Sequence, residues 1–557
     1  MNDKKVLKKN SFVEGTIVAT ISIFLVKLLG MLYVIPFYGM IDAKATALYA
    51  YAYNIYSIFL DISIAGIPIA MSKIIKEYDT LGKIEAKERA YRLGRNIIFI
   101  ISLVVFFTLF IFAPQIGTLL LGDLEGGNTI QDVALAIRCV STSILIVPFL
   151  SVAKGYLQGH NIIGVSSISQ VLEQLVRIAV ILGGTYLTIY VLGKSHSIAV
   201  CVAVTGAFFG ALSALLYVIK KIRLHKKSID VKKLEVDKDI SNKEIIKKIF
   251  AYAIPFIIID TMHSIYNFTD MAIVLRMMSD VGFSTSAVEF ISSTISTWAP
   301  KISVVITTVA MGMTVSLIPS IVQAFTLKDY KEVDKKVNQA LQMIIVISLP
   351  MAVGLALLAK PMWGIFYGIS NEYGYSILAI VVFVSFVNNM MLVTNSTLQS
   401  VNKFKEAYIA SILGFVVNII LDITFIQLFA KVGIPAYFGA SAASIVAFMS
   451  SVLYALLVLK KKEGLHYGKT VKFAFKLLIP VGFMVLGVVG VNLLFNYFGI
   501  DYNNKLMSIL NVGVSTVVGG LIYCGILIKT GTLKKVFGEA YYNKLLRKLT
   551  FGKLGNK

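Results

Sequence analysis

Charged residues are scarce in this sequence. Of its 557 residues only 15% are charged, whereas 57% are hydrophobic, and the mean hydropathy is +0.79. Ordinary soluble domains carry roughly 25% charged residues, so this composition excludes a soluble enzyme. Apolar runs such as Ile97–Leu121 and Pro480–Ile500 contain no charge and are long enough to cross a bilayer as helices. We therefore expect an all-α protein that crosses a membrane many times.

Cysteine and the motifs of nucleotide or metal chemistry are also lacking. Cys139, Cys201 and Cys524 are too far apart for a metal knuckle or a disulfide framework. Gly464–Thr470 is one residue short of a phosphate-binding loop. Asp237-Lys238-Asp239 imitates the diacid of glycosyltransferases, but its loop is too short to form their globular domain. We therefore predict no enzymatic activity, no cofactor and no use of ATP.

Acidic residues are fewer than basic ones. The chain has 30 Asp and Glu against 53 Lys and Arg, a formal net charge of +23. In a soluble chain this excess would suggest a nucleic-acid partner. Here no aromatic residues interleave the basic clusters, and most Lys and Arg fall in alternate loops, as in the cytoplasmic loops of membrane proteins. We predict no nucleic-acid partner, a plasma-membrane location and cytoplasmic termini.

The apolar runs predict fourteen transmembrane helices, of which the first twelve form two similar halves. Gly155–Asn161 resembles Ser396–Asn402, and Gly66–Pro68 resembles Leu317–Pro319, in each case at corresponding helices. Two six-helix lobes of the same topology are typical of a transporter. The predicted regions are an N-lobe at 1–220, a basic cytoplasmic linker at 221–248, a C-lobe at 249–460, two further helices at 461–530 and a basic amphipathic cytoplasmic tail at 531–557.

Ionisable residues interrupt several of these runs. Each charge near the bilayer centre costs roughly 2.5–3.5 kcal/mol, so these residues must pair or face a wet cavity. A cavity that contains several cations would stabilise a phosphate or pyrophosphate group. The cations predicted to bind substrate are Lys27, Arg138, Arg177, Arg276 and Lys301, and the acids predicted to bind a coupling Na⁺ or H⁺ are Asp61, Asp270 and Asp422.

Structural roles are the alternative for several of these residues. Glu173 and Arg177 lie four apart on one helix face and can form an ion pair. Lys27 can form a cross-helix salt bridge, and Arg276 and Lys301 can extend to the outer interface. His263 is more typical of a packed or hydrogen-bonded histidine than of a ligand.

Prolines within the predicted spans mark candidate hinges. Each removes a backbone hydrogen bond and bends or loosens its helix. The predicted hinges are Pro36, Pro68 and Pro319, the last two at matching positions of the two lobes.

Three segments near the N-terminus carry a family resemblance: Leu29–Pro36, Leu48–Tyr56 and Ala65–Lys73. They resemble the stage V sporulation protein B and lipid II flippase-like branch of the MOP flippase superfamily. The length, the fourteen spans and the repeated Leu-Gln segments extend the match over the whole chain. Val34 stands where this branch usually has a basic residue, and Lys27, about two turns earlier, is the candidate substitute.

The resemblance implies a V-shaped pair of lobes and two extra helices with a groove for a lipid tail. It implies transport of undecaprenyl-pyrophosphate-linked cell-wall precursor to the outer leaflet by alternating access, in peptidoglycan synthesis. The implied partners are a lipid-linked anionic glycan, membrane lipids and, as candidates, cell-wall synthesis proteins. The alternatives are a MATE-type cation-coupled multidrug antiporter, a flippase for another lipid-linked oligosaccharide and an intramembrane transferase. The cation-rich first lobe favours the precursor flippase over the antiporter.

Overall fold

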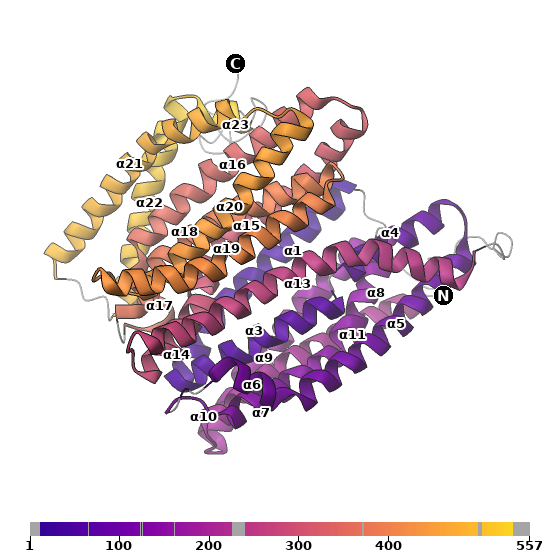
Figure 1. Cartoon of the computed structure of the whole chain (residues 1–557), viewed down its shortest axis with the longest axis horizontal. Coiled ribbons are helices and arrows are strands. Elements are labelled where there is room, and N and C mark those ends of the chain that lie inside the picture. Colours follow the sequence, from indigo (N-terminus) through magenta and orange to yellow (C-terminus); the bar gives the residue numbers. More distant parts are fainter. Residues whose placement is uncertain are drawn as a thin grey trace, which may run out of the picture. The chain divides into compact units, whose positions relative to one another are not determined.

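The regular structure of this protein is helical (Figure 1). The computed structural model describes residues 12–64, 66–122, 124, 126–160, 162–224, 240–369, 372–499 and 504–537, and no strand occurs among them. Eleven helical segments of this part are long and apolar enough to cross a membrane. The prediction of an all-α, multi-pass membrane protein is confirmed. The other three predicted spans fall on helices α3, α13 and α15 (bounds below), and the count of fourteen stays a prediction.

The chain divides into two compact units. The first comprises Met1–Lys301 with Ile426–Ala436, and the second comprises Ile302–Phe425 with Tyr437–Lys557. The first unit therefore includes helices from 242 to 298 that the sequence assigned to the C-lobe. The predicted lobe boundaries, which follow the internal repeat rather than compactness, stay a prediction.

The first unit contains the helices that precede Lys301. Their bounds are α1 (Phe12–Leu32), α2 (Val34–Met40), α3 (Ala43–Ile64), α4 (Ile67–Thr80), α5 (Ile84–Ile111), α6 (Ala113–Leu121), α7 (Ile130–Ser141), the 3₁₀ turn η1 (Thr142–Leu145), α8 (Val147–Gly159), α9 (Ile163–Tyr186), the π turn η2 (Leu187–Val191), α10 (His196–Val204), α11 (Gly206–Leu224), α13 (Asn242–Asp280), α14 (Thr285–Ser293) and the π turn η3 (Thr294–Trp298).

Helix α15 begins in the first unit and continues into the second. The bounds of this and the later helices are α15 (Ala299–Thr326), α16 (Tyr330–Leu357), α17 (Ala359–Tyr367), α18 (Glu372–Ser400), α19 (Phe404–Lys431), α20 (Tyr437–Glu463), α21 (Gly468–Tyr497), α22 (Lys505–Lys529) and α23 (Thr532–Phe537). Most of the predicted basic tail and linker lies outside the described residues.

The three candidate hinge prolines lie in different backbone settings. Pro68 is in the first turn of α4, two residues after Gly66, whose φ of 72° is left-handed and favours glycine. Pro36 is in the first turn of α2, just after α1 ends at Leu32. The helical backbone of α15 passes through Pro319 without a break. The helix is therefore interrupted beside Pro36 and Pro68 but not at Pro319. The hinge motion itself stays a prediction.

Helices α9 and α11 approach closely because glycine recurs at four-residue spacing. A Cβ on Gly210 would lie 2.6 Å from the carbonyl oxygen of Glu173, and one on Gly206 would lie 2.9 Å from that of Arg177. This spacing is typical of tight helix pairs in membranes. The contact braces the turn of α9 that carries two charged side chains of the candidate site.

Gly210→Ala is therefore expected to destabilise the first unit by about 1–3 kcal/mol, the usual cost of overpacking. Thermal unfolding of the purified protein in detergent measures this change. Gly183→Ala is the matched control on α9, because a Cβ there meets no atom within 4 Å. Removing a helical glycine at such a site should stabilise the protein by about 0.5–1 kcal/mol. Equal effects of the two changes would contradict the packing argument.

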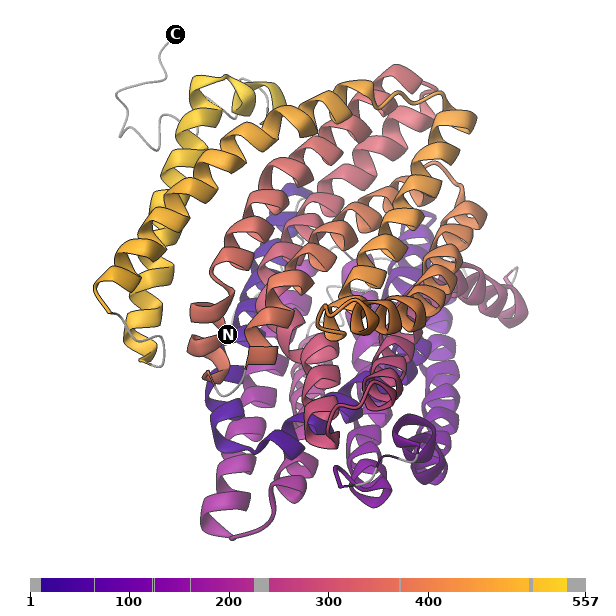
Figure 2. The ribbon, with the colours of Figure 1, turned by 60° about the vertical axis from the view of Figure 1, so that its left-hand side comes forward.

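In the second unit, α21 and α22 run side by side in both views (Figures 1 and 2). Helix α21 also packs on α16. The Tyr523 hydroxyl of α22 donates a hydrogen bond of 2.7 Å to the Val346 carbonyl of α16. The two predicted additional helices therefore pack against this unit as a pair.

Candidate functional site

The tyrosines of α3 form one face of the candidate site. Tyr49, Tyr53 and Tyr56 are spaced i, i+4, i+7, which places them on the same side of the helix. Tyr33, at the break between α1 and α2, reaches this face, and its hydroxyl lies 3.0 Å from that of Tyr49. Tyr53 is 47% exposed, whereas the other three are buried. Tyr53 is therefore the one of these four tyrosines that is accessible from outside the helix packing.

The ammonium of Lys301 lies among these rings. Its Nζ donates a hydrogen bond of 2.9 Å to the Tyr33 hydroxyl. It lies 5.0 to 5.7 Å from the ring centroids of Tyr33, Tyr49, Tyr53 and Trp298, within the range of cation–π attraction. No carboxylate of the described chain forms an ion pair with Lys301. The side chain is held by aromatic groups, and its extension to the outer interface stays a prediction.

A π turn precedes Lys301 and places Trp298 beside the tyrosine face. The turn η3 inserts between α14 and α15, and all of its residues except Ser296 are buried. Asn54 of α3 donates a hydrogen bond of 2.9 Å to the Thr297 hydroxyl of η3. Such π turns are frequent at functional sites because they redirect side chains within a helix.

A charged triad lies on α8 and α9. Glu173 accepts from Arg177 Nη2 at 2.7 Å and from Lys154 Nζ at 3.0 Å. The three side chains are 15%, 28% and 12% exposed, respectively. The predicted Glu173–Arg177 pair is confirmed. Lys154 was not among the predicted charges, and it leaves this group with one net positive charge.

The triad and the aromatic face belong to one site. Helix α9, which carries Glu173 and Arg177, packs against both α1 and α2, the two helices that flank Tyr33. We call the whole set the basic–tyrosine cluster; it comprises Tyr33, Tyr49, Tyr53, Tyr56, Lys154, Glu173, Arg177, Trp298 and Lys301. Three cations and one carboxylate make it electropositive, and the tyrosine hydroxyls add hydrogen-bond donors. This combination suits an anion that carries several oxygen atoms.

The described contacts of the other predicted substrate cations do not involve the basic–tyrosine cluster. Arg138 Nε donates to the Phe110 carbonyl at 3.1 Å and its guanidinium packs on the Phe110 ring. Arg276 Nη2 donates to the Leu119 carbonyl at 2.7 Å. Lys27 is half-buried on α1 and forms no ion pair within the described residues. None of the described contacts joins these three side chains to the basic–tyrosine cluster.

The predicted coupling acids are dispersed between the units. Asp61 of α3 accepts a hydrogen bond of 2.5 Å from Ser264 of α13. Asp270 lies on α13 and is 5% exposed. Asp422 is fully buried on α19, where it accepts from the Asn418 amide at 3.1 Å. Asp61 and Asp270 therefore belong to the first unit and Asp422 to the second, and no cluster of metal-ligating residues occurs in the part of the chain that the structure describes.

His263 is hydrogen-bonded, as its isolation in the sequence indicated. Its Nδ1 lies 3.2 Å from the Asn267 side-chain amide. This residue needs no ligand role.

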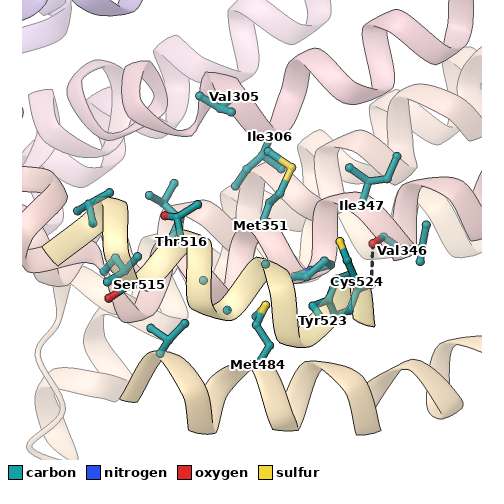
Figure 3. Close-up of a pocket in the computed structure, with 18 of the residues that line it drawn as sticks. Val305, Ile306, Val346, Ile347, Met351, Met484, Ser515, Thr516, Tyr523 and Cys524 are labelled. Atoms are coloured by element: carbon teal, nitrogen blue, oxygen red, sulfur yellow. Dashed lines mark hydrogen bonds between the residues drawn. The ribbon is translucent and has the colours of Figure 1, made fainter. Parts of the chain in front are cut away.

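An apolar hollow of about 460 Å³ lies in the second unit, between α22 and α16 (Figure 3). Met351, Met484 and Tyr523 project into it from three different helices. Its further lining includes Ile302, Val305, Ile306, Val346, Ile347, Pro350, Val488, Thr516, Gly519, Gly520 and Cys524. Few polar atoms line the hollow, so it suits hydrocarbon rather than an ion.

Two family models match the sequence. The model described as polysaccharide biosynthesis protein matches residues 12–325, more than half of the chain. The chain belongs to this family. A second model, described as MatE, matches residues 255–424.

Curated relatives and solved structures agree with this membership. The chain is 29% identical to the lipid II flippase MurJ of Bacillus subtilis over 95% of its length and 97% of the relative's. It is 22% identical to stage V sporulation protein B of the same organism over 66% and 68%. A solved structure of the lipid II flippase MurJ in an inward closed conformation has a TM-score of 0.65 at 17% identity, covering 92% of this chain and 99% of the other. The fold is shared with solved MATE transporters of the MOP superfamily, with a TM-score of 0.61 at 15% identity for one in an inward-facing conformation.

Two parts of the basic–tyrosine cluster that were not predicted could have been recognised from patterns in the sequence. The i, i+4, i+7 tyrosines of α3 share a helix face, and Lys154 stands six residues after Pro148 in an otherwise uncharged segment. The pairing of Lys154 with Glu173 had no signal, because the two residues belong to different helices.

Proposed function

We propose that this protein is a flippase for undecaprenyl-pyrophosphate-linked cell-wall precursor, a substrate like lipid II. The observation that carries the proposal is the basic–tyrosine cluster, in which Lys301 has no described carboxylate partner. Membership of the polysaccharide biosynthesis protein family and the match to a lipid II flippase over almost the whole chain support it.

In this proposal the cluster binds the pyrophosphate group. Arg177 offers a planar guanidinium and Lys301 an ammonium, both of which form charge-assisted hydrogen bonds with phosphate oxygens. Glu173 keeps Lys154 and Arg177 from repelling each other while the site is empty of anion. Alternating access then carries the headgroup from the inner to the outer leaflet, with both termini cytoplasmic.

The apolar hollow beside α22 is the proposed seat of the lipid tail. It is wide enough for a hydrocarbon segment, and the Tyr523–Val346 hydrogen bond holds α22 on α16 beside it. A tail held there would stay in an apolar environment while the charged headgroup crosses.

Gly520→Leu tests this role, because Gly520 lines the hollow and a Cβ there meets no atom within 4 Å. We expect transport of a long-chain substrate to fall about tenfold, the equivalent of roughly two methylenes of lost burial, while a short-chain analogue is unaffected. Gly513→Leu on the same helix is the control, because Gly513 is exposed and outside the hollow. Equal loss for both chain lengths would argue against a tail site.

Asp422 is the strongest of the proposed coupling acids. It is fully buried, and its partner Asn418 also donates to the Ser444 hydroxyl at 3.4 Å. Carboxylate, amide and hydroxyl oxygens are ligands that hard cations prefer.

Asp422→Asn is therefore expected to abolish any dependence of transport on Na⁺ or pH while leaving the protein folded, since Asn keeps the shape and hydrogen-bonding capacity. Transport into proteoliposomes under imposed Na⁺ and H⁺ gradients measures this. Unchanged gradient dependence would remove Asp422 from the coupling site.

A MATE-type drug antiporter is the second candidate, supported by the match of residues 255–424. Depletion of the protein in its host, followed by measurement of lipid II in each leaflet, distinguishes the two functions. The flippase proposal predicts that precursor accumulates on the inner leaflet. Normal delivery to the outer leaflet with no redundant flippase present would overturn it and leave the antiporter.

A further inference from the structure

A second hollow, of about 310 Å³, lies in the first unit among α5, α8 and α11. These helices pack against one another, and Figure 1 shows them in the same part of the unit. The volume is at the lower end of the roughly 300–1,000 Å³ that small-molecule sites occupy. The apolar lining is Phe149, Val152, Leu215, Ile219 and Ile222, and the polar lining is Glu88, Tyr91, Arg95, Tyr156 and Arg223. None of these residues belongs to the basic–tyrosine cluster.

The polar groups leave a small positive excess. Glu88 accepts a hydrogen bond of 2.7 Å from the Tyr156 hydroxyl. Arg95 and Arg223 are exposed and have no hydrogen bond or ion pair with any residue that the structure describes. Two guanidiniums and one carboxylate amount to one net positive charge. This matches a monoanionic phosphodiester better than a pyrophosphate, which carries more negative charge.

The hollow borders an exposed apolar surface. Phe149, in its wall, packs on Phe99 with the ring centroids 6.0 Å apart, and Phe99 is 50% exposed. On the neighbouring helices Ile100 is 63% exposed and Leu216 is 60% exposed. In a membrane protein, exposed large apolar side chains on spanning helices contact lipid chains. An occupant can therefore enter from the bilayer and keep its acyl chain along this apolar surface.

The two arginines also lie at strongly basic helix ends. Arg95 is in the N-terminal half of α5, after Arg89 and Arg92, and Arg223 follows Lys221 at the end of α11. The excess of Lys and Arg predicts that these ends are cytoplasmic, where the inner leaflet carries anionic lipid and a negative surface potential. Basic pockets between helices at that level bind anionic lipid headgroups.

We propose that this hollow binds the phosphodiester headgroup of an anionic glycerophospholipid. Arg95 and Arg223 hold the phosphate oxygens, Tyr91 borders the headgroup, and the Phe149–Leu215 wall receives the first part of an acyl chain. The site is separate from the proposed transport route, so its occupant is a resident lipid of the first unit rather than cargo.

Native mass spectrometry of the delipidated full-length protein, titrated with phosphatidylglycerol or phosphatidylcholine, tests this proposal. The test variant is Arg95→Gln with Arg223→Gln. The matched control is Arg92→Gln with Lys220→Gln, which removes the same charge from the same two helices outside the hollow. We expect the test variant to bind phosphatidylglycerol about tenfold more weakly and the control to bind as the unaltered protein does. Phosphatidylcholine binding should be weak in all three.

Ile219→Trp supplies a second arm, because it fills the apolar wall and leaves both arginines in place. It should weaken phosphatidylglycerol binding, because the acyl chain loses its place along the wall while both guanidiniums remain. Equal losses in the test and control variants would overturn the proposal in favour of general surface attraction. Displacement of bound lipid by inorganic phosphate at similar concentration would overturn it in favour of a free-anion site, and selective displacement by undecaprenyl pyrophosphate would assign the hollow to the substrate.

Discussion

Lys301→Met is expected to lower transport of the lipid-linked substrate by roughly 10- to 100-fold, the loss that follows from removing one charge-assisted hydrogen bond worth about 1.5–3 kcal/mol. Met occupies a similar volume and suits the rings of Tyr33, Tyr49 and Trp298, so the first unit should fold normally. The charge that is removed is one that no described carboxylate neutralises. Transport assayed in proteoliposomes, with the thermal midpoint measured in parallel, separates a binding defect from a folding defect.

Lys301→Arg is the matched variant for this experiment. Arginine keeps the positive charge and its attraction to aromatic faces, so we expect it to retain a large share of the transport that Met loses. A Met variant with full transport would show that the ammonium only completes the packing of the aromatic face. A Met variant that loses transport together with its thermal midpoint would point to a structural role.

Glu173→Ala is expected to have the largest effect on stability. It leaves Lys154 and Arg177 adjacent without the carboxylate to which both donate at 3.0 Å and 2.7 Å. Breaking a buried ion pair from one side costs about 3–5 kcal/mol, and the partial exposure of Arg177 places this triad at about 3 kcal/mol. The free energy of unfolding in detergent, or the thermal midpoint where unfolding is irreversible, measures the change.

Two further variants make this test specific to the triad. Adding Lys154→Met to Glu173→Ala removes one of the two unpaired cations and should recover part of the lost stability, a non-additivity expected only for residues in one network. Glu77→Ala is the control in the same unit. It breaks the 2.8 Å pair with Lys248, whose side chains are about one-third exposed, and should cost no more than about 1 kcal/mol. Equal costs for Glu173→Ala and Glu77→Ala would contradict a structural role for the triad.

The control pair, Glu77 with Lys248, links two helices of the first unit. The hydrogen bond from Lys248 to Glu77 raises the pKa of the Lys248 ammonium. It ties the start of α13 to α4 in the first unit. Its exposed setting nevertheless keeps its contribution small.

The candidate site was predictable only in part. The Glu173–Arg177 pair could be predicted because its partners lie on one helix, where spacing alone decides which side chains meet. Arg177 and Lys301 were singled out as cations within apolar runs, and both belong to the basic–tyrosine cluster, but their role in substrate binding stays a prediction. Arg138 and Arg276 had the same pattern in the sequence, but both bind backbone carbonyls in the structure. A charged residue within an apolar run must find a partner in the folded protein, but the sequence does not show which residue that partner is.

The sequence by itself determined that this is a helical, multi-pass membrane protein, because hydrophobicity and helix length are properties of contiguous residues and the cost of exposing charge to lipid is the same in any fold. It also indicated the family, through short contiguous segments of the first two helices. The tertiary structure alone decided that Lys301 lies among Tyr33, Tyr49 and Trp298 and that Lys154 neutralises Glu173. Those groups come from separate helices, and which side chains meet across helices depends on how glycine contacts and π turns set the approach and rotation of each helix.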